Sequence, residues 1–189
     1  WNWTLENLKK TNREMNVSAQ YVTDDGATRI YVSLDKDTLE PQVSFGQSED
    51  YGVKVDWGDG SEPETAEGWN YTKITLTHRY REPGEYVIRF LPQGENQVSF
   101  FGSYNSGSYA FTAGKSNVRE NMKYLSAVRK IEAGSQIREL GDYCFSSFSR
   151  LESLTMGKAI EWGNGVVKEC YSLRFLGLPE GKEMLSGYF

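Results

Sequence analysis

The sequence predicts a mostly β protein, in which an antiparallel β-sandwich is followed by a segment of short repeats, with a small helix between them. Short stretches of alternating polar and apolar residues fill the first half of the 189-residue chain, and turn-forming residues separate them. Apolar pairs recur at a spacing of 22 or 23 residues in the last third. Aromatic residues and glycine are abundant while there are only 4 Met, which favours strands over packed helices.

The composition excludes several classes of protein. With 38% hydrophobic and 25% charged residues, the chain can bury a core and is neither disordered nor embedded in a membrane. No apolar run approaches the roughly 20 residues that span a bilayer. A formal charge of −5 without a basic stripe argues against a nucleic-acid binder. One His and two Cys are too few for zinc fingers or a disulfide-dense scaffold, and we expect Cys144 and Cys170 to be free, buried thiols.

Six segments between residues 28 and 101 have the alternation of a half-buried strand. They are residues 28–34, 42–45, 51–57, 71–78, 85–90 and 97–101. Residues 58–61 (Gly-Asp-Gly-Ser) form one turn signal, and Pro83 with Gly84 forms another. Five to seven short strands without intervening helices predict an antiparallel sandwich.

Two helices are predicted outside these strands. The N-terminal segment, residues 1–16, contains a candidate helix over 3–15 that Thr4 would cap. Residues 102–127 form a connector with a short helix over 117–127. The apolar residues expected to share one face of this second helix are Val118, Met122 and Leu125.

Residues 128–189 contain an internal repeat. Its copies begin at Val128, Leu151 and Leu173, each with another apolar residue three positions later. A period in the low twenties is typical of leucine-rich repeats, whose coils stack their apolar residues on those of the neighbouring coil. Because such arrays need about three repeats and this one has two and a fragment, we expect the coils to lean on the sandwich or to continue in a longer parent protein.

Two sets of motifs resemble known families. Residues 55–60 (Val-Asp-Trp-Gly-Asp-Gly), 78–80 (His-Arg-Tyr) and 83–87 (Pro-Gly-Glu-Tyr-Val) resemble the PKD-type immunoglobulin-like domain. This resemblance assigns residues 17–101 to an immunoglobulin-like sandwich. Residues 128–189, most clearly Ile-Arg-Glu-Leu-Gly at 137–141 and Glu-Cys-Tyr-Ser-Leu at 169–173, resemble the BspA-like leucine-rich repeats of bacterial surface proteins.

The combination resembles secreted or surface-anchored bacterial proteins. It implies an extracellular or cell-surface location, no cofactor, no catalytic activity, and adhesion to a host or matrix protein or to a glycan. The alternative it leaves open is a spacer or accessory module of a phage tail protein or of a larger secreted enzyme. Because a fold does not fix a function, both remain hypotheses.

The acidic turn after residue 55 is a weak candidate for a metal site. Carboxylates of Asp56 and Asp59 on a tight turn could hold calcium, but the spacing is not that of an EF-hand. The favoured interpretation is structural. Trp57 fills the sandwich, Gly58 and Gly60 permit the bend, and Asp59 bonds amides within the turn.

Catalytic sites find little support in the sequence. His78 is the only imidazole, lies at the end of a predicted strand, and is expected to pack or to bond a neighbouring loop. Tyr80 is expected to anchor a corner of the sandwich. A carbohydrate-active enzyme remains a third hypothesis, because turn carboxylates such as Asp35, Asp37 and Asp50 could form a catalytic pair, although solubilising loop charge explains them more simply.

Aromatic residues on loops are the candidate binding residues, because they stack on sugar rings and anchor protein partners. Trp69 and Tyr71 follow the long loop after residue 60, and Tyr104, Tyr109 and Phe111 lie in the connector. The connector aromatics are more simply explained as covering the seam between sandwich and repeats. For Trp69 and Tyr71 binding and burial are equally supported.

Overall fold

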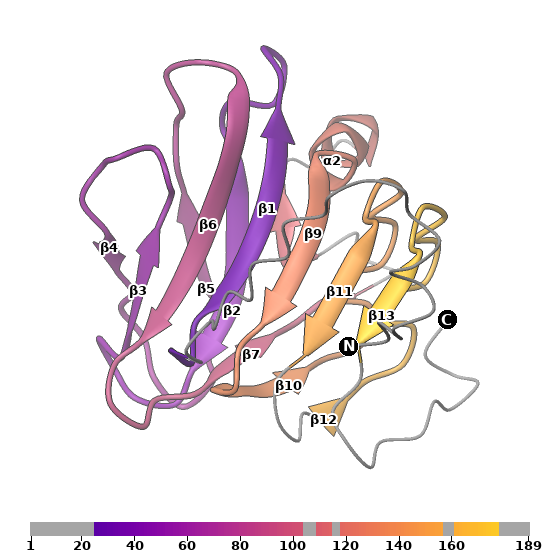
Figure 1. Ribbon diagram of the computed structural model, residues 1–189. Helices are drawn as coiled ribbons and strands as arrows, with labels where there is room; N and C mark the ends of the chain where they lie inside the picture. The colour runs from indigo at the N-terminus through magenta and orange to yellow at the C-terminus, as the bar shows by residue number, and fades with distance from the viewer. Residues whose placement is uncertain (1–24, 104–108, 115–117, 157–160, 178–189) are drawn as a thin grey trace, which may run out of the picture.

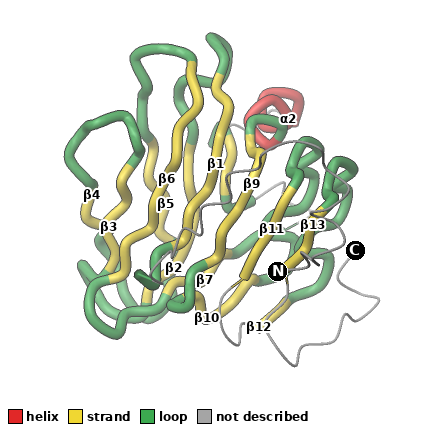
Figure 2. The backbone as a smooth tube through the Cα atoms, viewed as in Figure 1, coloured by secondary structure: helices red, strands yellow, loops and turns green. Residues whose placement is uncertain are grey.

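The computed structural model describes residues 25–103, 109–114, 118–156 and 161–177. Within these ranges the chain forms thirteen strands and one short helix, arranged as two layers of mixed β-sheet (Figure 1, Figure 2). The mostly β class with a single short helix after the first strands is therefore confirmed for this part of the chain. The helix predicted over 3–15 lies outside the described residues.

Each layer is one sheet. The first, in spatial order, contains β13 (Phe175–Gly177), β11 (Ser153–Met156), β9 (Val128–Ala133), β1 (Thr28–Leu34), β6 (Gly84–Pro92), β3 (Val53–Asp56) and β4 (Glu64–Thr65). The second contains β12 (Glu161–Trp162), β10 (Ile137–Leu140), β7 (Val98–Phe100), β2 (Gln42–Gln47) and β5 (Ile74–Thr77), and β8 (Phe111–Thr112) also pairs with β2.

The sheets are mixed: the sequence predicted antiparallel pairing for the sandwich alone and gave no strand direction for the repeats. The strands before residue 93 pair antiparallel, as in β1 with β6 and β2 with β5. From β9 onward, β11 pairs parallel with β9 and β13, and β10 pairs parallel with β7 and β12. The cause is the coiling of the repeats. Each turn of the chain places one strand in each layer before returning, so successive strands of a layer run in the same direction.

The alternation of side chains explains why these strands form. In β1, Ile30, Val32 and Leu34 are buried while the residues between them are half-buried, as the two-residue period requires. Five other predicted strands also appear, with bounds that shift by a few residues. Two further strands before the repeats, β4 and β8, were not predicted, because they contain two residues each and are too short to show a period. For residues 128–189, where β9 to β13 lie, the sequence predicted coils without strand bounds.

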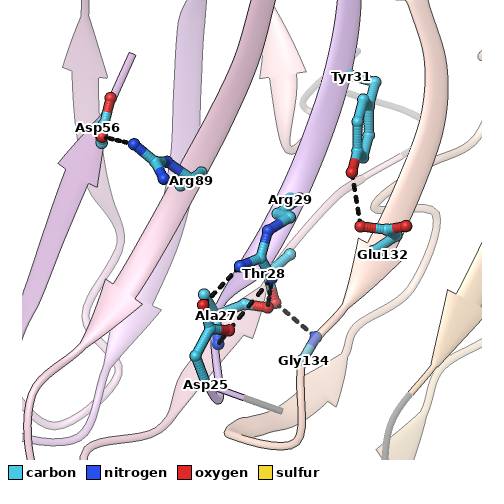
Figure 3. A network of polar contacts seen from close by, with 9 residues as sticks. All are labelled: Asp25, Ala27, Thr28, Arg29, Tyr31, Asp56, Arg89, Glu132 and Gly134. Atoms are coloured by element: carbon cyan, nitrogen blue, oxygen red, sulfur yellow. Dashed lines mark hydrogen bonds and ion pairs between the residues drawn. The ribbon is translucent and has the colours of Figure 1, made fainter. Parts of the chain in front are cut away.

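Both sheets continue from the first half of the chain into the repeats. In the first sheet β1 lies between β6 and β9, and in the second β7 lies between β2 and β10. Side chains also bridge the first junction, where Tyr31 donates to Glu132 Oε2 (2.7 Å) and the Gly134 amide donates to Thr28 Oγ1 (3.0 Å; Figure 3). The repeats therefore extend the sheets of the sandwich and do not dock on its faces.

One hydrophobic core runs between the layers. A chain of aromatic contacts crosses it from Phe45 through Phe90 and Phe100 to Phe145 and Phe148, with ring centroids 5.0 to 5.8 Å apart. All five side chains have no exposed surface. The sandwich and the first coils therefore share their interior.

The sequence repeat corresponds to stacked coils. Leu154 pairs with Ile131 on one side and Leu176 on the other, so residues 23 and 22 positions apart lie in register. The backbone repeats as well, because φ is positive at Ser147 and, 22 residues later, at Glu169 (62° at each). The apolar period of the sequence therefore identifies which residues lie in register in neighbouring coils.

Helix α2 (Val118–Leu125) lies within the segment predicted for it, but its buried face differs from the prediction. Met122 is 40% exposed, whereas Tyr124 and Leu125 are buried. Asn121 is also buried, and its Oδ1 accepts a hydrogen bond from the Ala113 amide (3.2 Å). A polar residue thus takes part in the buried face, because it satisfies a backbone donor next to β8.

Candidate functional site

A corner of aromatic residues follows β3. Trp57 and Tyr80 are buried, and the Tyr80 hydroxyl donates to the Trp57 carbonyl oxygen (2.8 Å). The His78 ring stacks on Trp57 with centroids 4.8 Å apart and an angle of 12° between the rings. Burial raises the pKa of Tyr80, so its hydroxyl stays protonated and remains a donor. These three side chains hold the turn against the core.

Two glycines shape the turn. Gly58 has φ of 76°, and a Cβ there would collide with the carbonyl oxygen of Val87. Gly60 has φ of 85° but no atom near its missing side chain. The second turn signal is placed where strand β6 begins, with Pro83 just before the strand and Gly84 as its first residue.

The Asp59 carboxylate is held on both sides. Its Oδ1 accepts from the Ser61 amide (3.0 Å) and hydroxyl (2.6 Å), and its Oδ2 lies 2.8 Å from His78 Nε2. Burial raises its pKa, but the hydrogen bonds from Ser61 and His78 outweigh this and lower it to about 2. Asp59 is therefore ionised at neutral pH.

The Ser61 hydroxyl, the Asp59 carboxylate and the His78 imidazole are not arranged in the order of a catalytic relay. A Ser-His-Asp site needs the imidazole between hydroxyl and carboxylate, so that the imidazole can take the hydroxyl proton. Here Asp59 lies between Ser61 and His78. A carboxylate with a pKa of about 2 is too weak a base to activate the hydroxyl at neutral pH, so the arrangement serves the turn.

The second acidic residue of the turn is engaged as well. Asp56 Oδ1 accepts from the Gly58 amide (2.8 Å), and its Oδ2 forms an ion pair with Arg89 (Figure 3). Across the residues that the structure describes, three or more His, Cys, Asp or Glu side chains nowhere gather as a metal site would require. Asp35 and Asp50 also accept backbone amides, those of Asp37 (2.8 Å) and Gly68 (2.7 Å).

The cysteines lie inside the stacked coils. Both thiols are free, with Cys144 buried and Cys170 half-buried. Burial raises the pKa of Cys170 to about 12 and also raises that of Cys144. Since the thiolate is the reactive form, neither group is a nucleophile near neutral pH.

Two of the aromatic residues named as candidate binders must be corrected. Phe111 has no exposed surface and Tyr109 is 9% exposed. The reason is β8, which pairs with β2 and carries Phe111 into the core beside Tyr124. These two residues therefore belong to the interior, in line with the alternative that they cover a seam. Tyr104 lies outside the described residues.

Trp69 and Tyr71 lie at the other end of β3, together with a tyrosine that sequence reasoning missed. Trp69 is 66% exposed, Tyr51 is 57% exposed, and Tyr71 is half-buried. We call Tyr51, Trp69 and Tyr71 the aromatic platform. Tyr51 was assigned to a strand because it fits the alternation of residues 51–57, but β3 begins only at Val53. The glycine that follows Tyr51 is the signal that could have placed it on a loop.

Hydrogen bonds fix the loop that carries the platform. Residues 66–72 lie against residues 47–51, and three loop amides find acceptors there. These are Gly68 N with Asp50 Oδ1 (2.7 Å), Asn70 N with the Ser48 carbonyl (3.1 Å) and Tyr71 N with the Gln47 carbonyl (2.8 Å). The two loops therefore form one unit.

Tyr71 links this unit to its neighbours. Its hydroxyl donates to Gln97 Oε1 (3.2 Å), and the Arg138 guanidinium of β10 lies 4.4 Å from the centre of its ring. Such a cation–π contact stabilises by about 0.5–1 kcal/mol at an exposed site. Tyr71 is thus the fixed member of the platform, whereas Trp69 and Tyr51 present free surface.

The backbone of the platform is strained. Among the described residues, six non-glycine positions have positive φ, and three of them recur within the coils. The other three are Tyr51 (54°), Asn70 (52°) and Tyr71 (55°). Non-glycine residues in this conformation cost of order 1–3 kcal/mol each and gather at ligand-binding loops. The strain that the coils do not explain lies wholly in these two loops.

A buried side chain beneath the loop adds to this cost. Gln47 Nε2 donates to the carbonyls of Ala66 (2.9 Å) and Gly68 (2.7 Å). Its Oε1 is buried and accepts no hydrogen bond within the described part of the chain. An unsatisfied buried acceptor costs about 1–3 kcal/mol of stability. The loop therefore keeps its conformation despite two costs, this unsatisfied oxygen and the strained backbone.

The only described helix is the eight-residue α2, which falls short of the length needed to cross a membrane. Comparison of the chain with protein-family models, with curated proteins and with solved structures finds no match. The function is therefore inferred from the residues and their arrangement.

Proposed function

We propose that this chain is a non-catalytic recognition module of an extracellular or cell-surface bacterial protein, and that it binds its ligand on the aromatic platform. The observation that carries this proposal is Trp69, a residue that is 66% exposed on a loop whose backbone amides donate three hydrogen bonds to the neighbouring loop. A large aromatic side chain presented by a rigid loop provides contact area with little entropy left to lose on binding.

The finer architecture is part of the proposal. We infer an immunoglobulin-like sandwich of PKD type in the first half and a short array of BspA-like leucine-rich repeats in the second. The antiparallel pairing of β1 with β6 and of β2 with β5 supports the former, and so does the hydrogen bond from the Tyr80 hydroxyl to the Trp57 carbonyl oxygen (2.8 Å), which lies 23 residues earlier in the chain. The register of Ile131, Leu154 and Leu176 supports the latter. The extracellular location follows from these two resemblances.

The geometry of the polar residues supports a role without catalysis. The only histidine, His78, is stacked on Trp57 and hydrogen-bonded to Asp59. In a Ser-His-Asp relay the imidazole lies between the hydroxyl and the carboxylate, but here Asp59 has that central position. The platform instead combines positive φ at three non-glycine residues with two strongly exposed aromatic side chains, and these features suit contact with a ligand better than bond breaking.

The proposal is tested by ligand arrays. The intact chain is applied to arrays of glycans and of extracellular matrix proteins, beside Trp69→Ala and Tyr171→Ala. Tyr171 is the matched control, because it is an aromatic residue 83% exposed on the repeats. We expect a ligand that Tyr171→Ala retains and that Trp69→Ala binds roughly tenfold more weakly, the loss typical of an exposed aromatic contact. Equal binding by all three proteins would contradict the proposal.

The continuity of the two sheets favours a second candidate, a rigid spacer or accessory module of a phage tail protein or of a larger secreted enzyme. Because the sandwich and the repeats share one core, the chain resists bending between them, and a rigid spacer needs this property. This alternative predicts no ligand on either array and, in the same open reading frame, domains for catalysis or virion assembly.

A further inference from the structure

We propose that the ligand of the aromatic platform is a neutral polysaccharide whose pyranose rings lie on Trp69 and Tyr51. This inference rests on the proposed function and adds the chemical class of the ligand. Three features of the platform carry it, namely its size, its charge and its rigidity.

The exposed aromatic area suits a few sugar rings better than a protein. Trp and Tyr side chains offer 150–250 Å² each when fully exposed, so at 66% and 57% exposure Trp69 and Tyr51 present on the order of 250 Å² together. A stable protein interface buries about 800 Å² on each partner around an apolar centre. The remaining strongly exposed aromatic residues of the described chain, Tyr171 and Phe175, lie on the repeats and do not enlarge the platform.

The charge around the platform disfavours an acidic ligand. Residues 48–51 and 66–72 contain three carboxylates, those of Glu49, Asp50 and Glu67, and one exposed basic residue, Lys73, directly follows the second loop. The nearby Arg138 is directed to the ring of Tyr71. These carboxylates can accept hydrogen bonds from sugar hydroxyls, whereas they repel uronates, sulfated sugars and phosphates. A ligand rich in hydroxyl groups and free of negative charge therefore complements the surface.

The loops are organised before the ligand arrives. Asp50 Oδ1 accepts both the Gly68 amide (2.7 Å) and the Tyr51 amide (3.1 Å), so one carboxylate holds Tyr51 and the residue that precedes Trp69. Because the strained backbone is already set, stacking a flexible polysaccharide does not require ordering the protein as well.

Affinity electrophoresis of the intact chain tests the inference. The neutral probes are β-1,3-glucan, β-1,4-mannan and β-1,4-glucan, and the acidic probes are polygalacturonate and heparin. We expect retardation by at least one neutral polymer, unchanged by raising the salt concentration tenfold, and no retardation by the acidic ones. Trp69→Ala should weaken retardation roughly tenfold and Trp69→Phe much less, because phenylalanine keeps a stacking face. Tyr171→Ala should behave as the wild type.

The outcomes separate this inference from the proposed function. Retardation by acidic polymers that falls with salt would overturn the inference and leave the platform as a site for another ligand. A matrix protein bound through Trp69, with no glycan bound, would overturn it in the same way. Retardation by neutral polymers that survives in Trp69→Ala would contradict both, because the site would then lie elsewhere.

Discussion

Truncating Ile131 to alanine should destabilise the whole described body, because this side chain sits where sandwich and repeats meet. Ile131 has no exposed surface, and in the first sheet it pairs with Ile30 on one side and with Leu154 on the other. The change removes three carbons, worth about 0.8 kcal/mol each, and adds a cavity term. We expect a loss of about 3–4 kcal/mol, a large part of the roughly 5–15 kcal/mol of a typical domain.

The assay is denaturation in urea combined with hydrogen exchange resolved by segment. If the core is shared, the amides of β6 and those of β11 lose protection together, and both report the same decrease in the free energy of unfolding. Ser153→Ala, a half-buried outward position on β11, should stay within about 0.5 kcal/mol of the wild type. Loss of protection in β9 to β13 alone, with β6 unchanged, would refute the reasoning and show two independent units.

Two further predictions concern the turn after β3. Gly58→Ala should cost more than Gly60→Ala, because both have positive φ but only the first meets a facing carbonyl oxygen. We expect about 1 kcal/mol for Gly60→Ala and at least about twice that for Gly58→Ala, measured by thermal unfolding; equal losses would contradict the close approach. Acid should weaken the fold through Asp59, whose pKa is lowered from 3.8 to about 2. The stabilisation is complete above pH 4 and is lost as the pH falls from about 4 towards 2. Because the residue is exposed, we expect about 1 kcal/mol, absent in Asp59→Asn, and an unchanged acid slope in that variant would contradict the assignment.

Alternation of polar and apolar residues predicted six of the eight described strands before the repeats, because the physical cause of that pattern is local. The alternation in residues 28–34 follows from one buried and one wetter face, and the structure has β1 over the same residues. The spacing of 22 or 23 residues likewise identified which apolar residues stack, since each coil repeats the same path. Two-residue strands such as β8 contain no period, so Phe111 was assigned to a loop although it is buried.

No local sequence pattern predicted that the sandwich and the repeats share their sheets. β1 pairs with β9 across about 100 residues of chain, and nothing in the sequence of either segment specifies the other as its partner. The platform was predicted in part for the same reason. Trp69 stood out as an aromatic residue on a long loop, whereas the alternation placed Tyr51 in a strand. The hydrogen bonds between the two loops, among them that of the Gly68 amide to Asp50 (2.7 Å), show that Tyr51 and Trp69 lie on one unit.

The most direct test of ligand binding on the platform is a nuclear magnetic resonance titration of the tryptophan indoles. The chain is labelled with ¹⁵N-tryptophan and titrated with the neutral polymer that retards it in affinity electrophoresis. The Trp69→Phe variant identifies the Trp69 signal, because that signal is lost in it. We predict that the Trp69 indole shifts with ligand concentration, while those of the buried Trp57 and the half-buried Trp162 do not. A Trp162 signal that shifts while Trp69 stays unchanged would place the ligand on the repeats and contradict the central claim.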